Sequence, residues 1–239
     1  MSDHIVRAFD NELKSLISRI SEMGGMAEGM IADGVEALVT MNVAAAREVV
    51  ARDKAIDDLQ REIDEAAILT IAKRQPMAQD LRVIISAIRI SNDLERVGDL
   101  AKNIGRRVIA VNGQFQNTRL LHGIERMADL SLAQLKNVLD ALAVRDVDLA
   151  HAVWSRDTEI DELYTSLFRE LLTYMMEDPR NITFCTHLLF CAKNIERIGD
   201  HATNIAETVI YLVTGQAMGE RRSQLSGDVI DFSNEVSNP

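Results

Sequence analysis

The sequence is poor in the residues that build β-sandwiches and their turns. Aromatic residues make up 4% of its 239 positions, and there are only 3 prolines. A β-sandwich draws more heavily on aromatic and turn residues, whereas long helices pack well through Ala, Leu, Ile, Val and Met. Because hydrophobic residues still make up 47% of the chain, within the range of globular proteins, the composition favours an all-α fold.

Cysteines and long apolar runs are scarce as well. Cys185 and Cys191 match neither a Cys-x-x-Cys motif nor a disulfide framework, which favours a reducing, intracellular setting. The N-terminus shows no basic region followed by an apolar stretch, so no secretory signal is expected. Apolar stretches such as 81–90 and 182–192 are roughly half of the ~20 residues that a membrane span requires. We therefore expect a cytoplasmic protein whose association with membranes is only peripheral.

Positive charge is in deficit. Lys and Arg total 26 against 37 for Asp and Glu, which gives a formal net charge of -11. The mean electrostatic field of such a chain repels a phosphate backbone. Nucleic acid is therefore not expected as a partner.

The chain contains an internal duplication. The segment 52–59 returns at 156–163, a shift of 104 residues, and the motif Glu-Arg-x-Gly-Asp at 95–99 returns at 196–200, a shift of 101 residues. Self-similarity of this kind indicates a structural unit that is present twice. The difference of three residues between the two shifts is small enough to be absorbed in a turn.

Each copy is expected to form a three-helix bundle, so the predicted fold class is all-α, with two tandem three-helix bundles. The first unit is assigned to residues 1–112 and the second to 113–215, while residues 216–239 form a tail that we expect to be poorly ordered. Pro76 and Pro179 mark the start of the third helix of each unit. The six helices are predicted near residues 3–40, 44–74, 77–111, 117–143, 146–177 and 179–213.

The repeated Glu-Arg-x-Gly-Asp motif places two carboxylates on one line of the third helix. Glu95 and Asp99 stand seven and eleven positions after Ile88, which returns each of them to within about 20° of that residue. Both therefore continue an apolar stripe, and the second copy repeats the relation. Acidic pairs on a core-facing line are costly, so each should bind a cation, meet basic side chains, or sit where the bundle opens to water. The stripe consists of Leu81, Ile84, Ile85 and Ile88.

The second helix of each unit adds another acidic pair with the same spacing. Carboxylates four residues apart on a helix can offer oxygens to one metal ion or to two neighbouring ions. Oxygen ligands suit divalent or trivalent ions such as Mg, Mn or Fe and argue against structural zinc. If antiparallel packing brings the second and third helices together, four carboxylates converge in each unit. The candidate metal ligands are Asp53, Asp57, Glu95, Asp99, Asp157, Asp161, Glu196 and Asp200.

Other interpretations of these carboxylates stay open. A single acidic pair on a helix is usually a solvated surface feature, and Arg96 and Arg197 could form ion pairs with the carboxylates without any metal. His201 could touch a metal, but Leu100 takes its place in the first copy, which favours a packing or surface role. A purely structural helical scaffold would bind no metal at all.

A metal-dependent enzyme, either a hydrolase or an oxidase, is the competing class of function. Such an enzyme needs an open coordination position and a substrate cleft, which sequence does not reveal. The chain carries no nucleophile motif, phosphate-binding glycine loop or dinucleotide fingerprint. It also lacks the Glu-x-x-His signature of di-iron helical bundles, which weighs against an oxidase.

The order, duplication and spacing of these motifs resemble the PhoU family, accessory and regulatory proteins of high-affinity bacterial phosphate transport. The matching features are Asp-x-x-x-Asp in the second helix and Glu-Arg-(Val/Ile)-Gly-Asp-x-Ala-x-Asn-Ile in the third, together with residues 75–82 and 176–179. The similarity runs from roughly residue 5 to 215. The resemblance implies a PhoU-like pair of three-helix bundles whose acidic motifs bind metal ions at the eight positions named above.

The resemblance also implies a non-enzymatic role, in which the protein restrains the phosphate-starvation response. The implied partners are the cytoplasmic ATPase subunit of the phosphate ABC transporter and a membrane sensor histidine kinase. Homodimers, and sometimes higher oligomers, are implied as well. Because Leu100 and His201 stand at equivalent positions, the two metal sites are not expected to be equivalent.

Overall fold

The computed structural model describes residues 2–111 and 119–218, except for the side chains of residues 2–8, 119 and 157. Within this part, every regular element is a helix. The tail predicted at 216–239 is described only as far as Met218, so its expected disorder falls outside the described residues. The elements are α1 (Ser2–Val39), α2 (Val43–Arg74), α3 (Gln79–Val111), α4 (Arg119–Val144), α5 (Val147–Ser155), α6 (Asp157–Glu177), the 3-10 helix η1 (Pro179–Asn181) and α7 (Ile182–Thr214).

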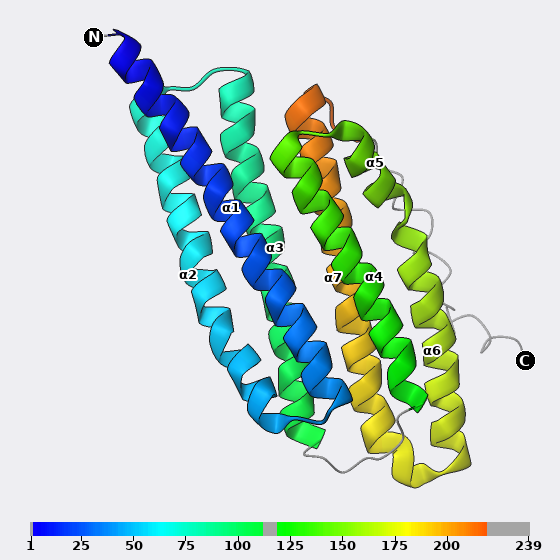
Figure 1. Ribbon diagram of the computed structural model, residues 1–239. Coiled ribbons are helices and arrows are strands. Elements are labelled where there is room, and N and C mark those ends of the chain that lie inside the picture. Colours follow the sequence, from blue (N-terminus) through cyan, green and yellow to red (C-terminus); the bar gives the residue numbers. More distant parts are fainter. Residues whose placement is uncertain (1, 112–118, 219–239) are drawn as a thin grey trace, which may run out of the picture.

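The helices form two bundles that lie side by side (Figure 1). Helices α1, α2 and α3 pack on one another, and α7 packs against α4, α5 and α6. The two bundles are joined along α3 and α7, which run antiparallel, and along α1 and α4. The predicted all-α fold with tandem three-helix bundles is therefore confirmed. The predicted boundary between the units falls within 112–118, outside the described residues.

The buried face of α3 differs from the predicted stripe. Ile84 is buried, but Ile85 and Ile88 are only partly buried and Leu81 is exposed. The face is wider and is rotated from the prediction because α3 contacts three neighbours, α1, α2 and α7. Its residues include Val83, Ile84, Ala87, Ile90, Leu94, Val97, Ala101 and Ile104. The carboxylates that continue the predicted stripe therefore lie at the edge of the core and not in its dry centre.

The turn from α2 to α3 delays the start of the third helix. Gln75 ends α2 in the left-handed region with φ 49°, and Ala78 also has a positive φ of 48°. Helix α3 therefore begins at Gln79, so the prediction that Pro76 stands in its first turn was wrong. In the second unit, Pro179 opens the short helix η1, and α7 follows at Ile182.

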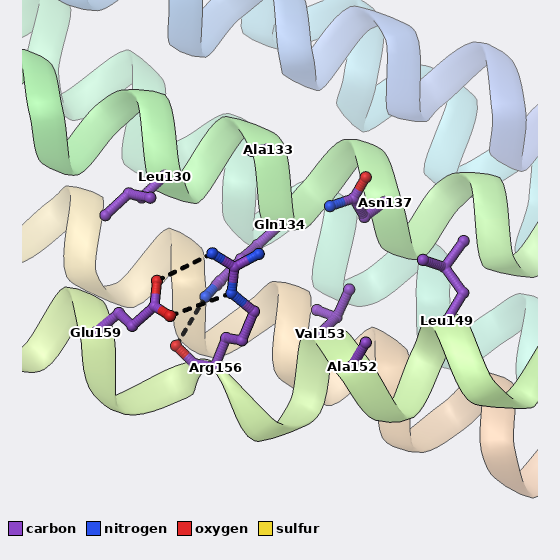
Figure 2. A pocket seen from close by; sticks show the side chains of 9 residues that line it. All are labelled: Leu130, Ala133, Gln134, Asn137, Leu149, Ala152, Val153, Arg156 and Glu159. Atoms are coloured by element: carbon purple, nitrogen blue, oxygen red, sulfur yellow. Dashed lines mark hydrogen bonds and ion pairs between the residues drawn. The ribbon is translucent and has the colours of Figure 1, made fainter.

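The helix predicted at 146–177 is broken at Arg156, which separates α5 from α6 (Figure 2). The side-chain Nε2 of Gln134 on α4 donates a hydrogen bond of 3.1 Å to the carbonyl oxygen of Arg156, and the same oxygen accepts from the Glu159 N–H at 3.2 Å. A side chain that enters the backbone hydrogen-bond ladder is a known cause of helix kinks. The equivalent position in the first unit is Met30, whose side chain has no N–H to donate, and α2 is continuous there.

Replacing Gln134 with Met should therefore allow α5 and α6 to join. The Oε1 of Gln134 is buried without a hydrogen-bond partner, and an unpaired buried polar group costs about 1–3 kcal/mol, so stability should not fall. We expect slower amide hydrogen exchange at residues 156–160. The control is Asn137→Met, one turn further along α4 and lining the same hollow. Unchanged exchange in the Gln134→Met variant would show that this amide does not cause the break.

Candidate metal centre

The packing of α2 against α3 brings together the four carboxylates predicted for the first unit, Asp53, Asp57, Glu95 and Asp99, here called the α2–α3 carboxylate cluster. Burial raises the pKa of Asp57, and the charges of Asp53 and Asp99 raise it further. Burial also raises the pKa of Glu95; Arg96 lowers it, while Asp99, Asp57 and Asp53 add to the rise. The four side chains are thus close enough to repel one another.

A lysine bridges the two helices inside this cluster. The Nζ of Lys102 donates a hydrogen bond of 2.6 Å to Oδ2 of Asp53 on α2, and another to Oδ1 of Asp99 on its own helix. The side chains of Lys102 and Asp53 are only 14% and 9% exposed. Burial alone would lower the pKa of Lys102, but the bonds to the two carboxylates outweigh it and hold that pKa above its usual value.

Lys102 was not among the site residues predicted from the sequence. The spacing could have indicated this residue, because a lysine three residues after Asp99 lies on the same face of the helix and can pair with it. The arginine that the sequence analysis considered, Arg96, does approach Glu95 at 3.4 Å and Asp99 at 3.7 Å. Its side chain is 62% exposed, however, and ion pairs in water contribute little.

The cluster keeps an excess of negative charge. Four carboxylates face the partly buried ammonium of Lys102 and the exposed guanidinium of Arg96, with Arg61 also acting on Asp57. Oδ1 of Asp53 is buried without a hydrogen-bond partner. This charge and the all-oxygen donor set fit a hard cation such as Mg²⁺ or Mn²⁺. Among the described residues, however, no three His, Cys, Asp or Glu side chains are already placed to hold a metal ion. A cation would therefore require the side chains, and Lys102 in particular, to rearrange.

The raised pKa of Glu95 has a consequence for stability. Because the folded protein holds this proton more tightly than the unfolded chain, the free energy of unfolding falls as pH rises from the ordinary pKa of glutamate through the raised one. The Glu95→Gln variant has no charge there, so in EDTA at pH 7 its thermal midpoint should exceed that of the wild type by a few degrees. The gain should vanish below about pH 4, where the native carboxyl is also protonated. Glu65→Gln, an exposed change on α2, is the control, and a lower midpoint for Glu95→Gln at pH 7 would contradict the expectation.

The second unit arranges its carboxylates differently. The side chain of Glu196 is 12% exposed; its Oε1 accepts from Lys193 Nζ at 2.7 Å, and its Oε2 is buried without a hydrogen-bond partner. Asp161 is exposed on α6 and Asp200 is partly buried on α7, and both take part in other interactions. The side chain of Asp157 lies outside the described part of the chain. Convergence of four carboxylates is therefore described for the first unit alone.

The other polar candidates contact groups outside the clusters. Nδ1 of His201 lies 2.9 Å from Oδ1 of Asp93, and Nδ2 of Asn204 donates to the same oxygen at 3.4 Å. These contacts join α7 to α3, so His201 links the two bundles. In the first unit, Oδ1 of Asn103 accepts from Arg106 at 3.3 Å.

The two cysteines are packing residues in the core. Both are buried, and burial raises the pKa of Cys191 to about 12. A thiol with such a pKa is not a reactive nucleophile. None of the helices in residues 2–111 and 119–218 has the length and apolar character of a membrane span.

Comparison with known proteins identifies relatives over nearly the whole chain. A family model described as the PhoU domain matches residues 20–108 and again residues 124–209. The phosphate-specific transport system accessory protein PhoU homolog of Rhizobium meliloti is 64% identical over 219 residues, which cover 91% of this chain and 92% of the relative. The homolog of the same name from Caulobacter vibrioides is 49% identical over 225 residues, covering 94% and 98%.

Solved structures share the fold. The crystal structure of PhoU from Pseudomonas aeruginosa has a TM-score of 0.84 at 40% identity and covers 87% of this chain and 100% of its own. The phosphate transport system regulatory protein PhoU from Streptococcus pneumoniae has a TM-score of 0.82 at 27% identity, with coverage of 88% and 99%. The family model matches once in each repeat and the relatives extend across both bundles, so this chain belongs to the PhoU family.

Proposed function

We propose that this chain is an accessory protein of phosphate-specific transport that regulates phosphate uptake and restrains the phosphate-starvation response. The observation that carries the proposal is the 64% identity, over 91% of the chain, to a Rhizobium meliloti protein named as a phosphate-specific transport system accessory protein. The name of the Streptococcus pneumoniae relative, a phosphate transport system regulatory protein, supports the regulatory part. The proposed location is the cytoplasm.

The protein acts by contact with other proteins and catalyses no reaction. The proposed partners are the ATPase subunit of the phosphate ABC transporter and a sensor histidine kinase, with a homodimer as the working form. Exposed apolar side chains support contact surfaces, because groups of them on soluble proteins usually mark interaction sites. They belong to two stretches of the chain, one around the turn from α2 to α3 and one along α6 and into α7. These side chains are Ile68, Leu69, Met77, Leu81, Phe168, Leu172, Met176 and Ile182.

The acidic motifs bind metal ions through oxygen ligands, with Mg, Mn or Fe preferred over Zn. Buried carboxylate oxygens without partners, Oδ1 of Asp53 and Oε2 of Glu196, support this part of the proposal, because buried charge is stabilised by cations. The residues that would hold the ions are the α2–α3 carboxylate cluster and, in the second unit, Asp157, Asp161, Glu196 and Asp200. A bound cation would offset the repulsion between carboxylates on neighbouring helices and fix the position of one helix against the other.

Deletion of the gene tests the proposed role in its own host. A phosphate-starvation reporter should become active in phosphate-rich medium, and the wild-type gene supplied in trans should silence it. Purified protein should retain the ATPase subunit or the kinase in a pull-down. Normal repression in the deletion strain would refute the regulatory role, and turnover of phosphoesters by the metal-loaded protein would favour the enzyme alternative.

A further inference from the structure

We infer that Lys102 is the resident cation of the α2–α3 carboxylate cluster and sets its affinity for metal. A divalent ion binds there only by displacing the Lys102 ammonium, whereas the second unit carries no lysine at the equivalent position. The inference refines the metal-binding part of the proposed function and rests on it. It makes the two units unequal, the first holding together without metal.

The ammonium group of Lys102 lies where a bound cation would be expected, between carboxylates of two helices. Lys102 Nζ joins Asp53 on α2 to Asp99 on α3, so it offsets their repulsion and ties the two helices together. The pair with Asp53 is largely withdrawn from water, since neither side chain is more than 14% exposed. Water screens such a pair little, and an incoming ion must therefore compete with the full strength of these bonds.

The internal repeat provides the comparison. At the shift of 101 residues that relates α3 to α7, Lys102 corresponds to Thr203, whose side chain is buried. The hydroxyl of Thr203 donates to the carbonyl oxygen of Gly199 at 3.2 Å, within its own helix. A threonine hydroxyl carries no charge, so this position in the second unit cannot offset carboxylate repulsion.

The lysine that does reach a carboxylate in the second unit comes from a different position. Lys193 lies three residues before Glu196, its side chain is about half exposed, and it pairs with one oxygen of Glu196. The other oxygen, Oε2, is buried without a hydrogen-bond partner. The equivalent of Lys193 in the first unit is Asn92. The described basic partners of the two units therefore come from different positions: Lys102 joins a carboxylate of α2 to one of α3, whereas Lys193 pairs with Glu196 on α7 and lies over the Tyr164 ring of α6.

The first cluster keeps the ligands that a metal needs once the ammonium is removed. Oδ1 of Asp53 already lacks a partner, and loss of Lys102 frees one oxygen each from Asp53 and Asp99. Exchanging Lys102 for the threonine of the second unit should thus convert the first cluster into a stronger metal site.

Mn²⁺ binding to EDTA-stripped protein tests this inference through equilibrium dialysis and elemental analysis. Lys102→Thr should bind Mn²⁺ at least tenfold more tightly at the first cluster, and adding Glu95→Gln should remove the gain. The matched control is Lys54→Thr, an exposed lysine on α2 whose loss changes the net charge equally. Equal binding by Lys102→Thr, Lys54→Thr and the wild type, or no binding by any of them, would overturn the inference.

A measurement on the wild type covers the case in which Lys102→Thr does not fold. Hydrogen exchange should show Mn²⁺-dependent protection of residues 53–57 and 95–99 only as the Mn²⁺ concentration approaches about 1 mM, the range of weak divalent sites. Protection of both segments at micromolar Mn²⁺ would mean that the lysine is no barrier to metal. The phosphate-starvation reporter measures neither Mn²⁺ affinity nor hydrogen exchange. Failure of the proposed regulatory role and failure of this inference are therefore distinguishable.

Discussion

Replacing Gly105 with valine is expected to lower the free energy of unfolding by about 3 kcal/mol, at the upper end of the range for overpacked cores. A Cβ atom at Gly105 would stand 3.0 Å from the carbonyl oxygen of Ala46 and 3.3 Å from Cγ2 of Val50. The first of these atoms belongs to the α2 backbone, which cannot rotate away as a side chain can. The valine should force α2 and α3 apart, and urea unfolding would measure the loss.

A second glycine offers the matched control. A Cβ at Gly25 on α1 would meet no other heavy atom within 4 Å, so Gly25→Val should not lower the free energy of unfolding, because valine has a higher helix propensity than glycine. The two substitutions both replace a glycine inside a long helix and differ in what surrounds them. If Gly105→Val unfolds at the same urea concentration as the wild type, α2 and α3 do not approach each other as closely as the structure indicates.

The fold could be predicted because its signals are local or repeated. Scarce proline and aromatic residues, helical spacing and two copies of one motif each indicate the same all-α architecture. The break between α5 and α6 could not be predicted, because it depends on a contact between different helices. Gln134 and Arg156 are 22 positions apart. The hydrophobic periodicity of residues 146–177 does not indicate that a side-chain amide of α4 will donate a hydrogen bond to the Arg156 carbonyl oxygen.

The carboxylate site was predictable in part for the same reason. Residues four apart lie on one face of a helix, so two such pairs can meet where antiparallel helices pack, and the four carboxylates of the first unit do meet. Which basic residue accompanies them could not be deduced. Arg96 and Lys102 both lie near Asp99 in sequence, and the choice depends on which flank of α3 faces α2. That orientation is set by the three neighbours of α3. The buried face of α3 is also the feature that was predicted wrongly, since it is rotated from the stripe expected from the sequence.

Loss of the Lys102 bridge between α2 and α3 is also expected to lower the stability strongly. In EDTA, Lys102→Met should lower the free energy of unfolding by about 3 kcal/mol, because removal of one partner leaves Asp53 charged and buried. Arg96→Met removes an equal charge from an exposed side chain at a distance of 3.4 Å or more, so its effect should stay below about 1 kcal/mol. Urea unfolding of both variants gives the comparison.

A double-mutant cycle separates the ion pair from the packing of the lysine stem. Asp53→Asn removes the buried charge that Lys102 compensates, so Lys102→Met should cost about 1 kcal/mol or less in that background, the difference being the coupling between the two side chains. If Lys102→Met and Arg96→Met destabilise the protein equally, the cluster is solvated and needs no internal cation. The unpaired oxygen of Asp53 would then no longer support a metal ion at this site. The stabilising role of Lys102 and the proposed metal ion both require that the Asp53 carboxylate be shielded from water.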